Sequence, residues 1–171
     1  MEKAMTAVDK PPALPAQRTA ELWKVIAGAV GGAVAVALME LLSAGGGYPL
    51  FAIPFATSIV LVMGAPDAEP AQPRALLGGH LVSALVGFAV LAIAGPHTWA
   101  AAAAVGLAIV AMHLTRTFHP PAGIDPLIIV VNAMPWTFLL MPVAVGAALL
   151  ALFAFAWHNA LRRGSWPARW W

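Results

Sequence analysis

The chain has 171 residues, of which 61% are hydrophobic and only 9% are charged, and its mean hydropathy is +0.85. A soluble domain carries about 25% charged residues, so this composition argues against a soluble globular enzyme. The net charge is only +2, and the basic residues do not form the continuous run that a nucleic-acid partner would need. Cysteine is absent, which excludes disulfides and thiolate metal ligands.

Six apolar segments follow one another along the chain, and a helix needs about 20 apolar residues to cross a bilayer. We predict spans at about 23–44, 48–63, 75–94, 98–115, 121–133 and 136–160. These spans make residues 23–161 a single transmembrane domain, flanked by tails at 1–22 and 162–171. The expected fold class is therefore all-α, a polytopic membrane helix bundle.

Basic residues are confined to alternate connections between these spans. They precede the first span, lie after the second and fourth, and follow the last, whereas 45–47, 95–97 and 132–135 contain no Lys or Arg. Positive residues stay on the cytoplasmic side. We therefore expect both tails to be cytoplasmic, the number of crossings to be even, and the membrane to be a bacterial inner membrane.

A weak internal repeat relates the second and fifth spans. Residues 54–62 align without gaps on residues 121–129, and each stretch opens with Pro, passes small or polar residues and becomes an aliphatic run. With three spans in each half, the two halves would have opposite orientations in the membrane. Inverted repeats with short, Pro- or Gly-interrupted helices are typical of secondary transporters.

The prolines of the repeat predict helices that start inside the membrane. A helix from Pro54 to about Gly64 would be only ~15 Å long, and a short helix after Pro121 would enter from the other side. Two helix N-termini would then face each other, with free N–H groups and positive dipole ends that bind anions. The alternative is that these prolines only kink two packed helices.

The stretch at 115–123, Thr-Arg-Thr-Phe-His-Pro-Pro-Ala-Gly, resembles the signature of the HPP family of small integral membrane proteins. Residues 64–84 and 159–170 resemble further motifs of that family: Gly64-Ala65-Pro66, Ala71-Gln72-Pro73-Arg74, Gly78-Gly79-His80 and Trp166-Pro167. The resemblance implies a multi-helix membrane domain. It also implies transport, because plastid and cyanobacterial members are associated with nitrite transport.

Two positions depart from the family's pattern. Thr57 precedes Ser58 where many members have Gly-Ala-Ser, and Asp125 follows Ile124 where members have a small residue and Thr. Asp125 would carry a coupling proton or a cation, or else cap a helix. The predicted substrate site joins the two helix starts to the motif: Thr57, Ser58, His119, Pro120, Pro121, Ala122, Gly123 and Asp125.

A cytoplasmic vestibule is predicted beside this site. Its basic and histidine side chains would form a partly protonatable funnel, the alternative being packing and headgroup anchoring: Arg74, His80, His113 and Arg116. No metal or cofactor is expected, since a helix break separates His113 from His119 and no carboxylate lies at ligand spacing.

Taken with the resemblance, these features predict a transporter or channel for a small inorganic anion, with nitrite as the first choice. One alternative is a non-catalytic membrane interaction subunit, which a dry, closely packed bundle would favour over a bundle with a deep polar cleft. A membrane enzyme that uses His119 or His113 with Asp125 is a weaker alternative, because no nucleophile is evident. The expected partners are the lipid bilayer and the anion, and the small size leaves room for a homo-oligomer.

Overall fold

The computed structural model describes residues 15–46 and 53–170, and these residues form helices and connections without any strand. The α-helices are α1 (Pro15–Gly46), α2 (Ile53–Gly64), α3 (Pro73–Ala94), α4 (Thr98–Leu114), α5 (Ile124–Val131) and α6 (Val145–Leu161). Short helical turns precede three of them: η1 (Glu69–Ala71), η2 (Pro120–Gly123) and η3 (Leu139–Ala144). The predicted all-α class is confirmed for this part of the chain.

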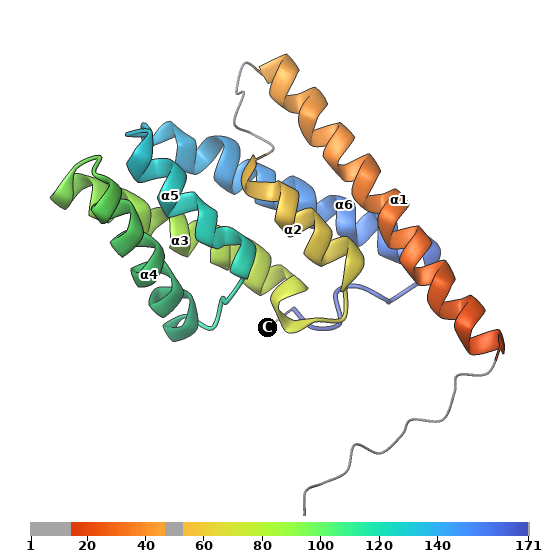
Figure 1. The fold of residues 1–171 in the computed structure, drawn as a ribbon. Helices are drawn as coiled ribbons and strands as arrows, with labels where there is room; N and C mark the ends of the chain where they lie inside the picture. The colour runs from red at the N-terminus through yellow and green to blue at the C-terminus, as the bar shows by residue number, and fades with distance from the viewer. Residues whose placement is uncertain (1–14, 47–52, 171) are drawn as a thin grey trace, which may run out of the picture.

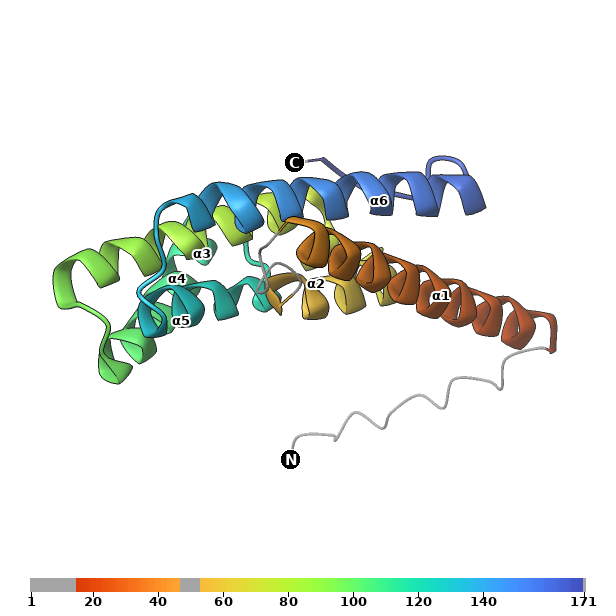
Figure 2. The same ribbon diagram turned by 90° about the horizontal axis from the view of Figure 1, so that it is seen from above.

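The helices form two groups that meet at α3 and α6. Figure 1 shows α1 and α2 beside α6, and α4 and α5 beside α3. Seen from above, α6 runs along one side of the molecule, while α1, α2 and α5 lie along the other (Figure 2). The η2 turn contacts both α2 and α3, so the segment with the His-Pro-Pro sequence lies where the groups join.

The helix bounds differ from the predicted spans in three places. α1 begins at Pro15, so part of the predicted N-terminal tail is helical. The first residues of the second span, 48–52, lie outside the described residues. The helix predicted to begin at Pro54 within that span begins at Ile53. The sixth span is interrupted, because Met141 has an extended backbone (φ −127°, ψ 114°) before Pro142.

Three helical stretches are long and apolar enough to cross a membrane: Gln17–Gly45, Pro73–Ala94 and Leu139–Leu161. Three further apolar helices are shorter, at Ile53–Gly64, Thr98–Leu114 and Pro120–Val131. The protein is therefore a multi-pass membrane protein. Six crossings and the inverted repeat stay predictions, because the shorter helices fall below the length of a full span.

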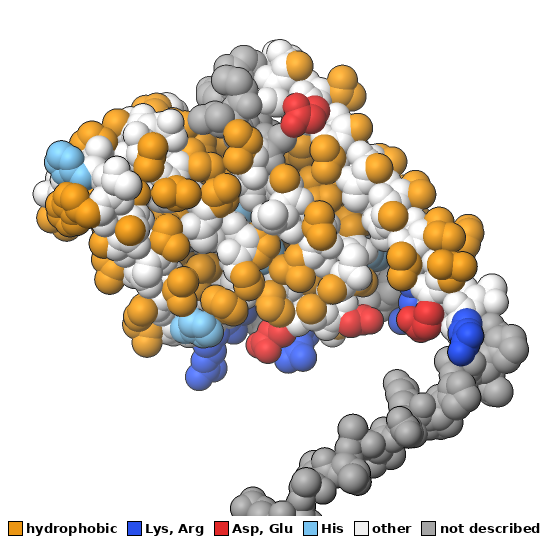
Figure 3. All heavy atoms as spheres, in the orientation of Figure 1, with side chains coloured by type: hydrophobic (Ala, Val, Ile, Leu, Met, Phe, Trp, Pro, Cys, Tyr) orange, Lys and Arg blue, Asp and Glu red, His pale blue; other side chains and the backbone are white. Residues whose placement is uncertain are grey.

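Charged side chains gather along one edge of the face seen in Figure 3, below a largely hydrophobic body. The start of α1 and the α2–α3 and α4–α5 connections lie at this edge (Figure 1). Arg18 and Arg116 lie in these segments, and Arg74 lies in the first turn of α3, directly after the α2–α3 connection. The helix ends at the opposite edge carry almost no charge. Such an uneven distribution of basic residues is typical of membrane proteins.

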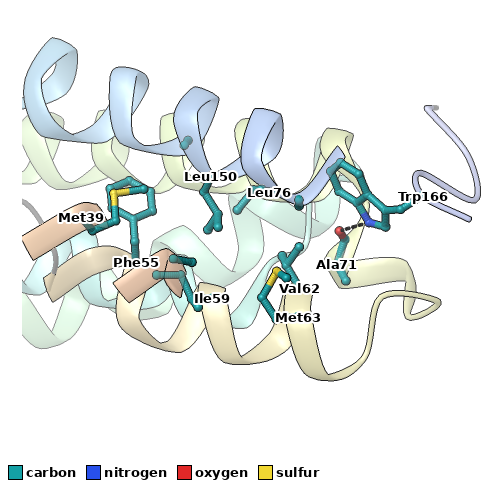
Figure 4. Packing of buried hydrophobic residues seen from close by; sticks show 12 residues of the cluster. Met39, Phe55, Ile59, Val62, Met63, Ala71, Leu76, Leu150 and Trp166 are labelled. Atoms are coloured by element: carbon teal, nitrogen blue, oxygen red, sulfur yellow. Dashed lines mark hydrogen bonds between the residues drawn. The ribbon is translucent and has the colours of Figure 1, made fainter. Parts of the chain in front are cut away.

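Apolar side chains fill the interior in three clusters. The largest joins α1, α2 and α6 and includes Met39, Phe55 and Leu150 (Figure 4). A second cluster joins α3, α5 and η3, and a third joins α4 and α5 to the end of α3. The polar residues described below lie where the first two clusters meet, since Phe55 also packs on His80.

Glycines on α3 allow the segment 117–126 to lie directly against that helix. A Cβ atom on Gly79 would come within 2.5 Å of the Cβ of His119, and one on Gly87 within 2.7 Å of the Cα of Pro126. Small residues permit such close backbone approach between membrane helices. Gly79 thus fixes how deeply His119 enters the bundle.

We expect Gly79→Val to destabilise the protein by about 1–3 kcal/mol, because the added methyl groups overpack the contact with His119. Thermal unfolding of the purified protein in detergent measures the effect. Gly106→Val is the matched control, since no atom lies within 4 Å of a Cβ built at Gly106 on α4. Equal losses of stability in the two variants would show that the close approach at Gly79 is unimportant.

The segment after α6, residues 162–170, folds back against the connection between α2 and α3, and we call it the C-terminal strap. Its Trp166 is only 1% exposed, and the indole Nε1 donates to the carbonyl of Ala71 at 3.3 Å (Figure 4). The side-chain oxygen of Gln72 accepts from the backbone N–H of Ala168 at 2.9 Å. The segment predicted as a tail is thus held on the protein.

Candidate functional site

Three regions far apart in the sequence bring four polar side chains to one buried place. Ser58 comes from α2, His80 from α3, His119 from the residue before η2, and Asp125 from the first turn of α5. All four residues are 0% exposed. Burial of ionisable groups is costly unless they are hydrogen-bonded to one another.

These side chains form a continuous row of hydrogen bonds, which we call the Asp125–Pro70 chain. His80 Nδ1 lies 2.8 Å from Asp125 Oδ2, and His80 Nε2 lies 2.9 Å from Ser58 Oγ. Ser58 Oγ is also 2.9 Å from His119 Nε2. The other ring nitrogen of His119, Nδ1, lies 2.6 Å from the carbonyl oxygen of Pro70 and donates to it.

The surroundings of the Asp125–Pro70 chain are apolar and tightly packed. The ring centroids of His80 and His119 are 5.2 Å apart, and the Phe55 ring covers His80 at 4.6 Å. Ser83, one turn along α3 from His80, donates instead to the carbonyl of Ala122 at 2.6 Å. Ser83 therefore ties η2 to α3 without joining the chain.

Asp125 is hydrogen-bonded through one oxygen only. Oδ2 contacts His80, whereas Oδ1 is buried and has no hydrogen-bond partner among the described residues. The side chain makes no capping bond at the start of α5. The structure therefore favours the alternative in which Asp125 has a chemical partner, His80, over a simple helix cap.

Five of the eight predicted substrate-site residues are not part of the Asp125–Pro70 chain. Thr57 and Pro120 are exposed on the outside of the bundle, while Pro121 and Gly123 are half-buried. Ala122 is buried and contributes its carbonyl to Ser83. Ser58, His119 and Asp125 are therefore the predicted site residues that the fold brings together.

The predicted vestibule is divided between the interior and the surface. His80 lies at the centre of the Asp125–Pro70 chain rather than beside the two arginines. Arg74 donates from Nη2 to the carbonyl of Thr115 at 3.0 Å, which ties the start of α3 to the end of α4. Arg116 is exposed and has a left-handed backbone (φ 56°), and it precedes the buried Thr117.

His113 also lies outside the buried row. It is exposed near the end of α4 and stacks on the ring of Phe118, with centroids 4.2 Å apart. Within the described residues, no group of three or more His, Cys, Asp or Glu side chains is arranged to hold a metal ion. The Asp125–Pro70 chain contains two imidazoles and a carboxyl group, which are side chains that can bind and release protons.

The sequence prediction missed one member of this site, Pro70, and gave another, Ser58, a different role. The Pro70 carbonyl, which fixes His119, comes from η1 in the α2–α3 connection. Ser58 was expected to ligate an ion, yet its hydroxyl bridges two imidazoles. Pro70 lies within the stretch 64–84 that resembles a family motif, which was a signal for it. Its contact uses a backbone carbonyl, however, and the residue type does not show whether a carbonyl is used.

Comparisons with known proteins agree on a membrane domain. The family model described as HPP, transmembrane region, matches residues 15–167. Over 126 residues the chain is 42% identical to one transmembrane protein of Dictyostelium discoideum and 38% identical to another, which covers 68% of this chain in both cases. These alignments cover only 40% and 44% of the two relatives, so the chain spans less than half of their length.

No solved structure matches the chain. The family match, in contrast, covers nearly all of the described residues, and it includes the His-Pro-Pro segment that supplies His119 to the buried row. The chain therefore belongs to the HPP family of integral membrane proteins.

Proposed function

We propose that this HPP-family protein is a transporter or channel for a small inorganic anion, with nitrite as the first choice, rather than an enzyme. The observation that carries the proposal is the Asp125–Pro70 chain, in which three ionisable residues, Asp125, His80 and His119, are 0% exposed inside a membrane bundle. Ionisable residues at such positions are expensive, and they mark ion pathways and proton relays in membrane proteins.

The position of the Asp125–Pro70 chain within the fold supports transport. Ser58 and Asp125 belong to α2 and α5, the two shortest α-helices of the described residues, and η2 before α5 packs against α2. Substrate sites of secondary transporters lie where interrupted helices of two repeats meet. On this proposal the protein has six crossings in two inverted halves, with both termini cytoplasmic in a bacterial-type inner membrane.

Anion selectivity is supported by the basic edge of the molecule. Arg74 lies at the start of α3, and Arg116 lies at the beginning of the α4–α5 connection, which leads to His119. A cationic entrance raises the local concentration of anions. The resemblance to nitrite-transporting members of the family makes nitrite the first anion to test.

Anion uptake into proteoliposomes tests the proposal, with nitrite, nitrate, formate and chloride compared. We expect saturable uptake of one of these anions, and we expect His119→Ala to lose most of it because that variant removes the link between Ser58 and Pro70. His97→Ala is the control, since His97 is exposed in the α3–α4 connection and stacks only on Trp99. The close packing around the row agrees with the alternative of a non-catalytic interaction subunit. That alternative becomes the better interpretation if folded, inserted protein moves none of the anions.

Arg116→Gln is expected to lower anion uptake at low ionic strength and to have little effect at high salt. Exposed charges act over a Debye length of about 10 Å at 0.1 M salt, so added salt screens the attraction that Arg116 provides. Arg163→Gln controls for the loss of one exposed positive charge after α6. A defect in Arg116→Gln that persists at all salt concentrations would mean that the residue acts by structure instead of charge.

One observation favours a second function. Asp125, His80 and Ser58 follow one another in the order of an Asp-His-Ser triad, which sequence reasoning had not assembled. The Ser58 hydroxyl, however, is fully buried and also bonds His119, so it lacks the access that a nucleophile needs. A fluorophosphonate that labels the protein but not the Ser58→Ala variant would show a reactive Ser58. That result would favour a hydrolase over the transporter proposal.

A further inference from the structure

The hydrogen bonds of the buried row determine how many protons it holds. This inference rests on the proposed function: we propose that the Asp125–Pro70 chain is a proton-binding site that carries one exchangeable proton and couples it to anion transport. The row contains four hydrogen bonds, from Asp125 to His80, from His80 to Ser58, from Ser58 to His119 and from His119 to Pro70. Each bond requires one hydrogen atom.

The Pro70 end of the row fixes the first of these hydrogens. A backbone carbonyl only accepts, so His119 Nδ1 must carry a proton. The remaining three bonds can then be satisfied in two ways, which differ in the direction in which the Ser58 hydroxyl points. Ser58 either donates to His119 and accepts from His80, or accepts from His119 and donates to His80.

The two arrangements contain the same number of protons. In the first, His119 is neutral, and the fourth proton lies between His80 Nδ1 and Asp125 Oδ2. In the second, His119 is doubly protonated and His80 is neutral, with its Nδ1–H directed at the ionised Asp125. In both arrangements the Asp125–Pro70 chain has zero net charge. Rotation of the Ser58 hydroxyl, with proton transfer along the hydrogen bonds, moves the excess proton from one end of the row to the other.

Loss of one proton leaves a state that the geometry does not support. Only three hydrogens would remain for four contacts of 2.6–2.9 Å, so two lone pairs would face each other in one of them. The group would also have a net charge of −1 in an apolar interior, which is unfavourable. The described geometry is therefore that of the proton-loaded state.

The groups facing the row from neighbouring elements do not supply a competing charge. On α3 the next charged residue is Arg74, which bonds the Thr115 carbonyl; η1 contributes Glu69, which is exposed. α4 ends with His113, exposed and stacked on Phe118, and α6 contributes His158, whose Nε2 lies 3.1 Å from the Val62 carbonyl. Among the described residues, the charge state of the row is set by Asp125, His80 and His119 themselves.

Asp125 Oδ1 gives the row a place for exchange. It is a buried oxygen that no described residue bonds, at the first turn of α5, and it can accept a proton from water or from a protonated substrate. A neutral, loaded row tolerates an anion nearby, whereas the empty row repels it. Proton and anion should therefore bind together and cross in the same direction, one proton taken from water on one side and released to water on the other.

Histidine-selective ¹⁵N NMR of the full chain in detergent tests the proton site without any transport. We expect the ring nitrogens of His80 and His119 to change in a single joint step as pH rises, because one proton is shared through Ser58. In Ser58→Ala the two rings should titrate separately. Ser83→Ala, which removes a neighbouring buried hydroxyl outside the row, should keep the joint step. Independent titration of the two rings in the unaltered protein would overturn the proton site.

Proteoliposomes with a pH-sensitive dye inside test the coupling. An inward proton gradient should drive anion accumulation, and Asp125→Asn should abolish this response, because its amide donates to His80 permanently and mimics the loaded state. Ser83→Ala should retain it. Anion uptake that ignores the proton gradient would overturn the coupling and leave anion transport standing. Joint titration without uptake of any anion would instead refute the proposed function and leave the proton site standing.

Discussion

His80→Leu is expected to destabilise the folded protein by about 3–5 kcal/mol, the usual cost of removing one partner of a buried ion pair. His80 is the only described partner of the Asp125 carboxyl, and both residues are 0% exposed. The variant would leave that carboxyl in an apolar interior without any hydrogen bond. Unfolding of the purified protein in detergent, followed by circular dichroism, measures the loss.

A double variant separates the lost pair from a general defect at this position. His80→Leu combined with Asp125→Leu removes both ionisable groups, and such replacements are often neutral or stabilising. We therefore expect the double variant to be more stable than His80→Leu alone, although it would lose transport. Stability losses that simply add would show that His80 and Asp125 are not energetically coupled.

Trp166→Ala is expected to cost about 3–5 kcal/mol, as for other large aromatic side chains removed from a packed site. Trp166 is among the largest fully buried side chains, and it packs in the same cluster as Val62, Ala71 and Leu76 (Figure 4). The indole also bonds the Ala71 carbonyl. Loss of the side chain would leave a cavity between the C-terminal strap and the α2–α3 connection.

Trp170→Ala is the matched control for this prediction. Trp170 lies in the same strap but is 58% exposed, so its removal should change stability little. Thermal unfolding of both variants in the same detergent gives the comparison. If Trp166→Ala and Trp170→Ala unfold alike, the strap is not part of the folded unit.

Much of the helix layout could be predicted because prolines and glycines mark helix ends in any environment. The start of α2 near Pro54 and its end at Gly64 follow from residue types alone, as does the end of α3 before Gly95. The charged edge was equally predictable from the positions of Lys and Arg. The strap was not, since a short segment without periodicity gives no sign that Trp166 docks on Ala71.

The polar row was only partly predictable, because its contacts join distant residues. Asp125 and His119 drew attention as ionisable groups beside a helix start, which is a property of the sequence. Their partner His80 is 45 residues from Asp125, and Ser58 is 61 residues from His119. The sequence placed His80 in a vestibule with the arginines, whereas its contact with the row depends on how closely the segment 117–126 packs on α3 at Gly79.

The C-terminal strap has a consequence for how the protein is made. The strap follows α6 and is therefore synthesised after all six α-helices, and domains generally fold from the N-terminus during translation. Until the strap arrives, the Gln72 side chain and the Ala71 carbonyl lack their partners Ala168 and Trp166. A nascent chain that stopped at Leu161 would expose an unfinished connection to proteases. The α2–α3 connection therefore obtains its full set of contacts only after α6 and the strap have been synthesised.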